Sequence, residues 1–372
     1  MKKGLLNKIG LLWLSALLFA LPAFCEAPDA VLFVNVGAAD ATIIRHEGQI
    51  ILIDTGSKES APKLLAALRH MGAQKVDAVF LTHSHQDHVG GLAALRQAFP
   101  VDRVYCAQIG KINKKGRHKT AAAARKQGWE PIMLAFGDTV KIGSLSLDVL
   151  GPLTENTLDD NDNSLVLKTV IDGTSYLFTG DMQFPEEKTL LSAHVNVKAD
   201  VLKVGNHGNP DATLPEFARA VAPDLAVIPT DTTEDKNSAN PRVMKALMPA
   251  DIRVTQQAQL GILVETTKEG LTASLLPLDA AVIKDVTLVV DKEQQTITLK
   301  GEGDLGGAVL YSNRGGETFV FPERTMLCGL LTVGAKGSNA DLTWPEKQPI
   351  HPTKSDDIFL FDRHGHSVAE GS

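Results

Sequence analysis

The stretch Thr82-His83-Ser84-His85-Gln86-Asp87-His88-Val89-Gly90-Gly91 places three histidines and an aspartate within six positions. The hydrophobic run Val76–Thr82 leads into it and predicts a buried strand. Imidazole and carboxylate groups are common ligands of zinc-like ions, so the strand would end in a metal-binding loop. Gly90 and Gly91 permit a tight turn into a helix that we expect to begin at about Val89. The alternative, a histidine-rich surface loop, does not account for ligand-type residues that directly follow a buried strand.

The motif His83-x-His85-x-Asp87-His88, followed by Gly90-Gly91, resembles the signature of the metallo-β-lactamase fold. The resemblance implies an α/β architecture, the αββα metallo-β-lactamase sandwich, with a metal site on one edge. It also implies that His83, His85, Asp87 and His88 are metal ligands.

The chain of 372 residues is long enough for two domains, and its composition is that of a globular protein. We expect a signal peptide over residues 1–27, a hydrolase domain over 28–278 and a small β-domain over 283–369. Only 5% of the residues are aromatic, so the sequence does not indicate an aromatic surface on which bases could stack. The three cysteines, Cys25, Cys106 and Cys328, are too few and too scattered for a disulfide framework.

The N-terminus has the layout of a secretory signal, with Lys2, Lys3 and Lys8 ahead of the apolar stretch Leu11–Leu21. A membrane-spanning helix is the alternative, but Pro22 interrupts a run that is already near the minimum length. We therefore expect an exported protein (secreted, periplasmic or cell-surface) without a transmembrane anchor after cleavage. Loss of the three lysines would take the formal charge from −7 to −10, so binding of a polyanion would need a local basic patch.

Two further stretches sharpen the resemblance. Val36–Ile44 resembles the opening of the ComEC-like branch of the fold, although Ala38 and Ala39 replace the usual Gln and Gly, and Asp40 is expected near the site entrance. Asn161–Lys168, followed by Thr179-Gly180-Asp181, resembles a second pattern of that branch. The branch contains secreted or membrane-linked hydrolases related to the DNA-uptake protein ComEC.

The resemblance implies roles for residues at the ends of other strands. Asp181 would bridge two metal ions, His207 would be a further ligand, and Asp54 would orient metal ligands from behind. Asn206 stands where relatives carry a histidine, and with Asp87 it is our candidate catalytic residue. An asparagine can hydrogen-bond but cannot act as a proton donor in the way a histidine does. The expected cofactors are two divalent metal ions, zinc or alternatively manganese.

The first metal position, formed by His83, His85 and Asp181, lacks a third histidine. His118 or Asn163 is the candidate to replace it, and an open position is also compatible with catalysis. The chemistry expected of such a site is hydrolysis by a metal-bound hydroxide in a dinuclear centre.

Positive charge is concentrated between Gln108 and Gln127, where no acidic residue occurs. Such a run is often a solvated loop and helix face. The functional interpretation is an arm that binds a phosphate-bearing substrate, with these candidate residues beside Asn163: Lys111, Lys114, Lys115, Arg117, His118 and Lys119.

From about Ile283 the sequence alternates short strand-like segments with turns, which predicts an all-β sandwich. These segments, with Trp344 among them, resemble the lamin-tail domain, an immunoglobulin-like sandwich found on bacterial secreted hydrolases. By analogy, the domain would serve binding or positioning, including a cell-surface partner.

The sequence thus predicts a secreted metal-dependent hydrolase, a phosphodiesterase or nuclease whose substrate is a phosphodiester such as DNA. Two alternatives stay open. One is a surface binding protein with a degenerate hydrolase domain, which Asn206 and Asn240 would suit. The other is a hydrolase of carboxylic esters or lactams.

Overall fold

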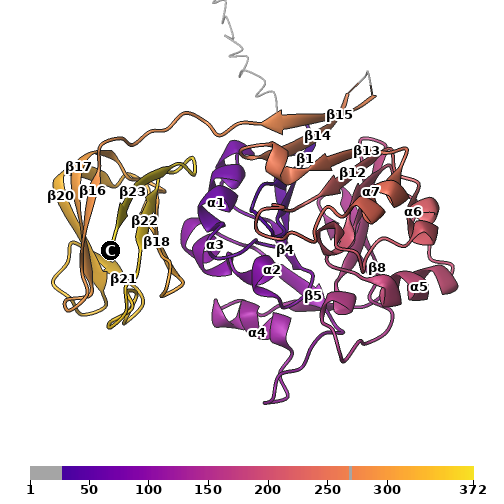
Figure 1. The fold of residues 1–372 in the computed structure, drawn as a ribbon, viewed down its shortest axis with the longest axis horizontal. Helices are drawn as coiled ribbons and strands as arrows, with labels where there is room; N and C mark the ends of the chain where they lie inside the picture. Colours follow the sequence, from indigo (N-terminus) through magenta and orange to yellow (C-terminus); the bar gives the residue numbers. More distant parts are fainter. Residues whose placement is uncertain (1–26, 268–269) are drawn as a thin grey trace, which may run out of the picture.

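A computed structural model describes residues 27–267 and 270–372 of the chain (Figure 1). The predicted signal peptide therefore lies almost wholly outside the described residues. Two β-sheets form the centre of the larger domain. The first has eight strands in the order β15-β14-β1-β2-β3-β4-β5-β6. Its strands are β1 (Ala30–Val34), β2 (Thr42–His46), β3 (Gln49–Ile53), β4 (Ala78–Leu81), β5 (Val104–Ala107), β6 (Ile132–Leu134), β14 (Gly261–Thr267) and β15 (Gly270–Leu276).

The second sheet has seven strands in the order β13-β12-β11-β10-β9-β8-β7. Its strands are β7 (Thr139–Ile142), β8 (Leu145–Gly151), β9 (Val166–Ile171), β10 (Thr174–Phe178), β11 (Val201–Lys203), β12 (Leu225–Ile228) and β13 (Asp251–Val254). Strands β9 and β10 form a hairpin at Asp172-Gly173, as an Asp-Gly pair between two strand-like segments predicts, and both residues have the positive φ that a tight hairpin turn requires.

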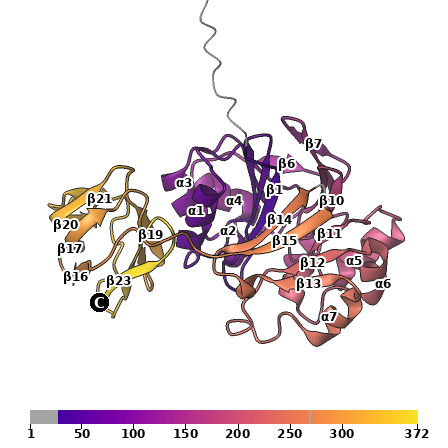
Figure 2. The ribbon, with the colours of Figure 1, turned by 90° about the horizontal axis from the view of Figure 1, so that it is seen from above.

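Helices cover the outer face of each sheet (Figure 2). Apolar side chains of α1 (Ala61–His70), α3 (Leu92–Ala98) and α4 (Lys119–Lys126) pack on the first sheet. Those of α5 (Phe184–Ser192), α6 (Pro215–Val221) and α7 (Pro241–Leu247) pack on the second. A third core, which includes Phe33, Phe80 and Phe178, joins the two sheets. This is an αββα sandwich, so the predicted fold class is confirmed.

Strand direction explains where the candidate site lies. Strands β3, β4 and β5 are parallel neighbours, and so are β10, β11 and β12. Carboxyl ends of parallel strands meet at one edge of a sheet, so the residues that follow β3, β4, β10 and β11 emerge together. The polar loops there carry Asp54, the His83–His88 run, Asp181 and His207.

The smaller domain consists of two four-stranded sheets around a core that contains the fully buried Trp344. One sheet has the order β16-β17-β20-β21 and the other β19-β18-β22-β23. The strands are β16 (Thr287–Asp291), β17 (Thr296–Asp304), β18 (Val309–Ser312), β19 (Glu317–Val320), β20 (Met326–Ala335), β21 (Leu342–Trp344), β22 (Ile358–Phe361) and β23 (Ser367–Gly371). The predicted β-sandwich is therefore present, whereas its likeness to a lamin tail stays a prediction.

The smaller domain packs on the helices of the larger one through β19, which contacts α3. Gln97 on α3 donates from Nε2 to the carbonyl oxygen of Thr318 (3.0 Å) and accepts from the backbone nitrogen of Val320 (3.0 Å). Tyr311 donates its hydroxyl to Glu59 (2.7 Å). These bonds hold β18 and β19 beside the part of the larger domain that carries the His83–His88 loop, which we call the metal loop.

Two local predictions were wrong. The helix expected from about Val89 begins earlier, as the single turn α2 (Gln86–Val89), and the chain restarts as α3 after Gly90-Gly91. The break follows from close packing, since a Cβ on Gly91 would collide with the carbonyl oxygen of Thr55. The stretch Gly143–Pro152, whose sequence predicts an edge hairpin strand, forms β8, which pairs with both β7 and β9 and therefore lies inside the sheet.

Strand β23 reaches Gly371, past the predicted domain limit of 369. Among the described residues, no helix is long and apolar enough to cross a membrane.

Candidate metal centre

His88 is completely buried, and carboxylates contact both of its ring nitrogens. Nδ1 lies 2.7 Å from Oδ2 of Asp54, and Nε2 lies 3.1 Å from Oδ2 of Asp181. Asp54 is held in turn by the backbone nitrogen (2.8 Å) and hydroxyl (2.6 Å) of Thr82 at the end of β4. A carboxylate behind a histidine ligand fixes the orientation of the ring, which is the role the sequence suggested for Asp54.

His207 lies in the short 3-10 helix η2 (Gly205–Gly208), where the chain takes an unusual course. Asn206 and His207 both have left-handed backbones, with φ of 44° and 52°. Such conformations are costly for residues other than glycine and are concentrated at functional sites. The turn places Nδ1 of His207 2.8 Å from the carbonyl oxygen of Pro229, while Nε2 lies 3.2 Å from Asp87 and 3.3 Å from Asp181.

Asp87, His88, Asp181 and His207 form one cluster. Each offers a ligand atom, and these atoms all lie within 4.8 Å of one another. The four residues come from α2, the end of β10 and the end of β11, so the fold brings together side chains that are far apart in the sequence.

His83 and His85 lie next to this cluster. Nε2 of His83 is 4.0 Å from Oδ2 of Asp181, and the His83 and His85 rings are 4.6 Å apart. Within the described part of the chain, buried Nε2 of His83 and Oδ1 of Asp181 have no hydrogen-bond partner. Buried polar atoms are rarely left unpaired, so these two fit a centre that a metal ion completes.

The protonation states of the three histidines differ. Burial is the largest effect on His88 and His207 and would lower their pKa values, but the surrounding carboxylates together outweigh it and raise both pKa values well above the usual range: Asp181 and Asp54 at His88, and Asp181, Asp87 and Asp40 at His207. Burial, with the nearby charge of His88, lowers the pKa of His83 far below its usual range. His83 is therefore a neutral imidazole, the form that binds a metal, whereas His88 and His207 must release protons first.

Asp87 is the most accessible carboxylate of the cluster, with 34% of its side chain exposed, against 3% for Asp181. Burial would raise the pKa of Asp87, but its hydrogen bond with His207 and the charge of His88 lower the pKa to about 2. Asp87 is therefore ionised at neutral pH.

Lys203 was missed in the sequence analysis. It ends the buried strand β11, is 3% exposed, and forms an ion pair with Asp40. Its Nζ also donates to the carbonyl oxygen of Gly180 (2.7 Å) and lies 3.6 Å from Oδ1 of Asp181. Asp40 is thus buried behind the cluster and does not lie at the site entrance. A lysine in an otherwise aliphatic buried strand was the available signal, because buried charges are normally paired.

Asp160 was also missed in the sequence analysis. It connects the metal loop to the positively charged stretch Gln108–Gln127, which we call the basic segment. Its Oδ2 accepts from the backbone nitrogen (3.1 Å) and the hydroxyl of Ser84, and its Oδ1 accepts from the backbone nitrogen of Lys111 (2.8 Å). Burial raises the pKa of Asp160, but the hydrogen bonds from Ser84, Asn163 and Lys111 lower it to about 2.

The proposed substitutes for the absent third histidine are engaged elsewhere. His118 caps α4 by accepting from the backbone nitrogen of Ala121 (3.3 Å), and its ring packs against Gly110. Asn163 exchanges two hydrogen bonds of 2.8 Å with the backbone of Asn156. Neither side chain completes the cluster in this structure.

Asn206, our candidate catalytic residue, lies beside the cluster. Its amide donates to Asp211 (2.9 Å) and accepts from Asn161 (3.4 Å). Its catalytic role stays a prediction.

The basic segment occupies the loop after β5 and the helix α4. In the described chain, no carboxylate lies within 4.0 Å of the charged groups of Lys111, Lys114, Lys115, Arg117, Lys119 or Lys126, whereas Arg125 pairs with Glu130. The segment therefore carries free positive charge next to the metal loop.

Comparison with known proteins agrees with this geometry. The sequence profile of the metallo-beta-lactamase superfamily matches residues 34–231. ComE operon protein 3 of Bacillus subtilis is 30% identical over 263 residues, which is 66% of this chain and 34% of that protein. Competence protein ComA of Neisseria gonorrhoeae is 28% identical over 54% of this chain and 27% of its own length. The chain thus spans about a third of the length of these relatives.

Two other proteins are similar to part of this chain. Hydroxyacylglutathione hydrolase of Aeromonas hydrophila is 44% identical over 108 residues, 29% of this chain and 35% of that enzyme. The crystal structure of the metallo-beta-lactamase fold protein YhfI from Bacillus subtilis covers 63% of this chain and 98% of its own, with 13% identity and a TM-score of 0.42.

The match to the superfamily profile covers the strands and loops that carry the whole His/Asp cluster. The competence-protein relatives confirm the predicted resemblance to the ComEC-like branch. This chain belongs to the metallo-beta-lactamase superfamily of hydrolases.

Proposed function

We propose that this protein is a metal-dependent phosphodiesterase that cleaves nucleic acid. The observation that carries the proposal is the position of Asp160. Its carboxylate binds Ser84, which lies between ligands His83 and His85, and also Lys111, at the start of the basic segment. The basic segment is thereby tied to the metal loop, where a phosphate would have to bind.

Charge distribution supports a phosphate-bearing substrate. The whole chain has a formal charge of −7, which opposes non-specific attraction of a polyanion. Basic side chains that are left without acidic partners beside the cluster provide the local attraction that nucleic-acid binding requires. An ester or lactam substrate would not need this concentration of positive charge.

Each residue of the cluster can be given a role in metal binding or proton transfer. His83, His85 and Asp181 would hold one metal ion, and Asp87, His88, His207 and Asp181 the other. Bound divalent metals supply Lewis acidity and lower the pKa of water towards 7. Asp87, ionised and accessible, can accept a proton from the attacking water. Asp54 and the backbone of Pro229 orient His88 and His207, while Lys203 balances the carboxylates of Asp40 and Asp181.

The names of the relatives support the same substrate class. A ComE operon protein matches 66% of this chain and a competence protein matches 54% of it. We further propose that zinc or manganese is the metal and that the protein is exported. The export proposal rests on Lys2, Lys3 and Lys8 and the apolar run that follows, outside the described residues.

The test is a substrate panel with the purified protein. Native protein should contain bound zinc or manganese and should hydrolyse single-stranded DNA, double-stranded DNA, RNA or bis(p-nitrophenyl) phosphate. It should leave a β-lactam and hydroxyacylglutathione intact. His85→Ala should abolish the phosphodiesterase activity, whereas His70→Ala, a histidine away from the cluster, should retain it.

Hydrolysis of hydroxyacylglutathione or the β-lactam with no cleavage of any phosphodiester would overturn the proposal. A metal-free protein whose melting temperature does not respond to chelators would support a degenerate domain instead.

A further inference from the structure

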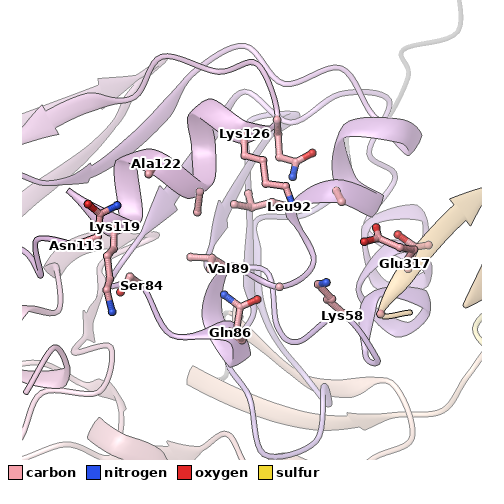
Figure 3. Close-up of a pocket in the computed structure, with 16 residues that line it drawn as sticks. Lys58, Ser84, Gln86, Val89, Leu92, Asn113, Lys119, Ala122, Lys126 and Glu317 are labelled. Atoms are coloured by element: carbon pink, nitrogen blue, oxygen red, sulfur yellow. The ribbon is translucent and has the colours of Figure 1, made fainter. Parts of the chain in front are cut away.

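A cavity of about 470 Å³ lies between the metal loop, α4 and the smaller domain (Figure 3). Ser84 and Gln86 line one end, so the cavity borders the loop that carries the candidate ligands His83, His85 and Asp87. Gly316, Glu317 and Thr318, at the start of β19, line the other end. Two domains therefore build its walls, and we call it the interdomain groove.

Positive charge dominates the groove. Lys58 enters from the loop before α1, and Lys119 and Lys126 come from the two ends of α4. Among the described residues, none of these three ammonium groups has a carboxylate within 4.0 Å. Lys58 and Lys126 were not among the substrate-binding candidates chosen from the sequence, because only the folded chain brings them to the same cavity.

Glu317 is the one acidic residue among the described residues that line the groove. Lys58 and Lys126 both lower its pKa electrostatically, although burial, the largest effect, raises it. The two lysines thus lie close enough to act on this carboxylate, and Figure 3 shows all three side chains around the same opening.

The wall formed by the smaller domain is held in place by specific contacts. Gln97 makes two hydrogen bonds of 3.0 Å to the backbone of β19. Nζ of Lys58 lies beside Gly316, so a Cβ added to this glycine would be 3.2 Å from that nitrogen. A groove built on such contacts is present before any substrate arrives.

The remaining lining is uncharged, and it is partly aliphatic (Val89, Leu92, Ala93, Ala122 and Ala123) and partly polar (Asn113 and Gln127). Among the described residues, no aromatic side chain lines the cavity, so bases have nothing to stack on. Lysines without aromatic partners recognise phosphate charge and not base identity.

We propose that the interdomain groove binds the sugar–phosphate backbone of a nucleic-acid strand, whose cleaved phosphate lies at the metal cluster. This inference rests on the proposed function and extends it. The smaller domain then forms part of the substrate site, and Glu317 weakens binding by repelling the strand.

The test measures binding of a fluorescein-labelled phosphorothioate oligonucleotide to the metal-loaded full chain by anisotropy across a range of salt concentrations. The double variant Lys58→Gln/Lys126→Gln should bind about tenfold more weakly at low salt. The slope of log affinity against log salt should become less steep by about 1.4, since each lost phosphate contact on a single strand removes about 0.7. Glu317→Gln should bind several-fold more tightly.

Lys188→Gln/Lys198→Gln, which removes two exposed lysines outside the groove, is the matched charge control and should bind like the native protein. Melting temperatures close to native would show that the variants are folded. Equal affinity and equal salt slope for the native protein and the double variant would overturn the groove proposal, and so would tighter binding by the double variant than by Glu317→Gln.

The two proposals fail separately. If native protein cleaves oligonucleotides but the double variant binds them normally, the groove is wrong and the phosphodiesterase proposal stands. If native protein cleaves no phosphodiester but binds the oligonucleotide through these lysines, the groove stands and the activity is wrong.

Discussion

The two sides of Asp181 differ in how completely the protein has arranged them. On one side, Asp87, His88 and His207 converge with Asp181, and their ligand atoms lie within 4.8 Å of one another. On the other side, His83 lies 4.0 Å from Asp181, and its ring lies 4.1 Å from that of His88, which belongs to the first group, and 4.6 Å from that of His85. We call these the closed side and the open side of the site.

The supporting hydrogen bonds explain the difference. On the closed side, Asp54 fixes the ring of His88 and the carbonyl oxygen of Pro229 fixes that of His207. On the open side, Nδ1 of His83 has only longer contacts with the hydroxyls of Thr82 (3.1 Å) and Ser164 (3.3 Å). Oriented ligands hold metal more tightly, so the closed side should bind its ion first. The open side has fewer protein ligands, which suits a catalytic metal position that also binds water or substrate.

The largest effect is expected from replacing Asp181, which both sides of the site share. Asp181→Asn should lower phosphodiesterase activity by at least about 10³-fold, because metal ions contribute several kcal/mol of transition-state stabilisation. Steady-state rates and metal content, measured by mass spectrometry, would test this. Asp148→Asn on the exposed face of β8 is the matched control. An Asp181→Asn protein with native metal content and rate would show that Asp181 does not bridge the two sides.

The next test separates the two sides by chelator titration. His85→Ala should keep one metal ion per chain at a chelator concentration that strips His207→Ala, since only the first variant leaves the closed side intact. Native protein should lose its two ions in two steps, the open side first. Loss in the opposite order would mean that the hydrogen bonds from Asp54 and Pro229 do not govern affinity.

The family resemblance and strand position together were enough to predict which residues converge at this site. His83, His88, Asp181 and His207 each follow a buried strand, and parallel strands bring such residues to one edge. The role of Lys203 was not predicted because its partner Asp40 is remote in sequence, although a lysine at the end of an aliphatic strand was a usable signal.

Features that depend on loop conformation or domain packing could not be predicted. The side-chain direction of Asn206 follows from a left-handed backbone conformation that the neighbouring sequence does not predict. The role of Asp160 depends on how its loop folds back on Ser84 and Lys111. The interdomain groove depends on the contact between Gln97 and β19, which joins residues more than two hundred positions apart.

The smallest expected effect concerns the loop that borders the open side and carries Asp160. Leu153, at its start, donates its backbone nitrogen to Oε1 of Glu186 on α5 (2.7 Å). Burial raises the pKa of Glu186 to about 7, even though this hydrogen bond lowers it. A carboxyl group whose pKa is raised in the folded state gives stability that is fully present below its unfolded pKa. That stability is lost as pH rises through about 7.

Glu186→Gln removes this titration. Between pH 5 and pH 9, the unfolding free energy of the variant should therefore rise relative to that of the native protein, by on the order of 3 kcal/mol. Denaturant unfolding at both pH values would measure the change, with the exposed Glu216→Gln on α6 as the control. If native protein and Glu186→Gln show the same pH dependence, Glu186 is already ionised in the folded state. The loop on the open side would then be anchored by a charged carboxylate.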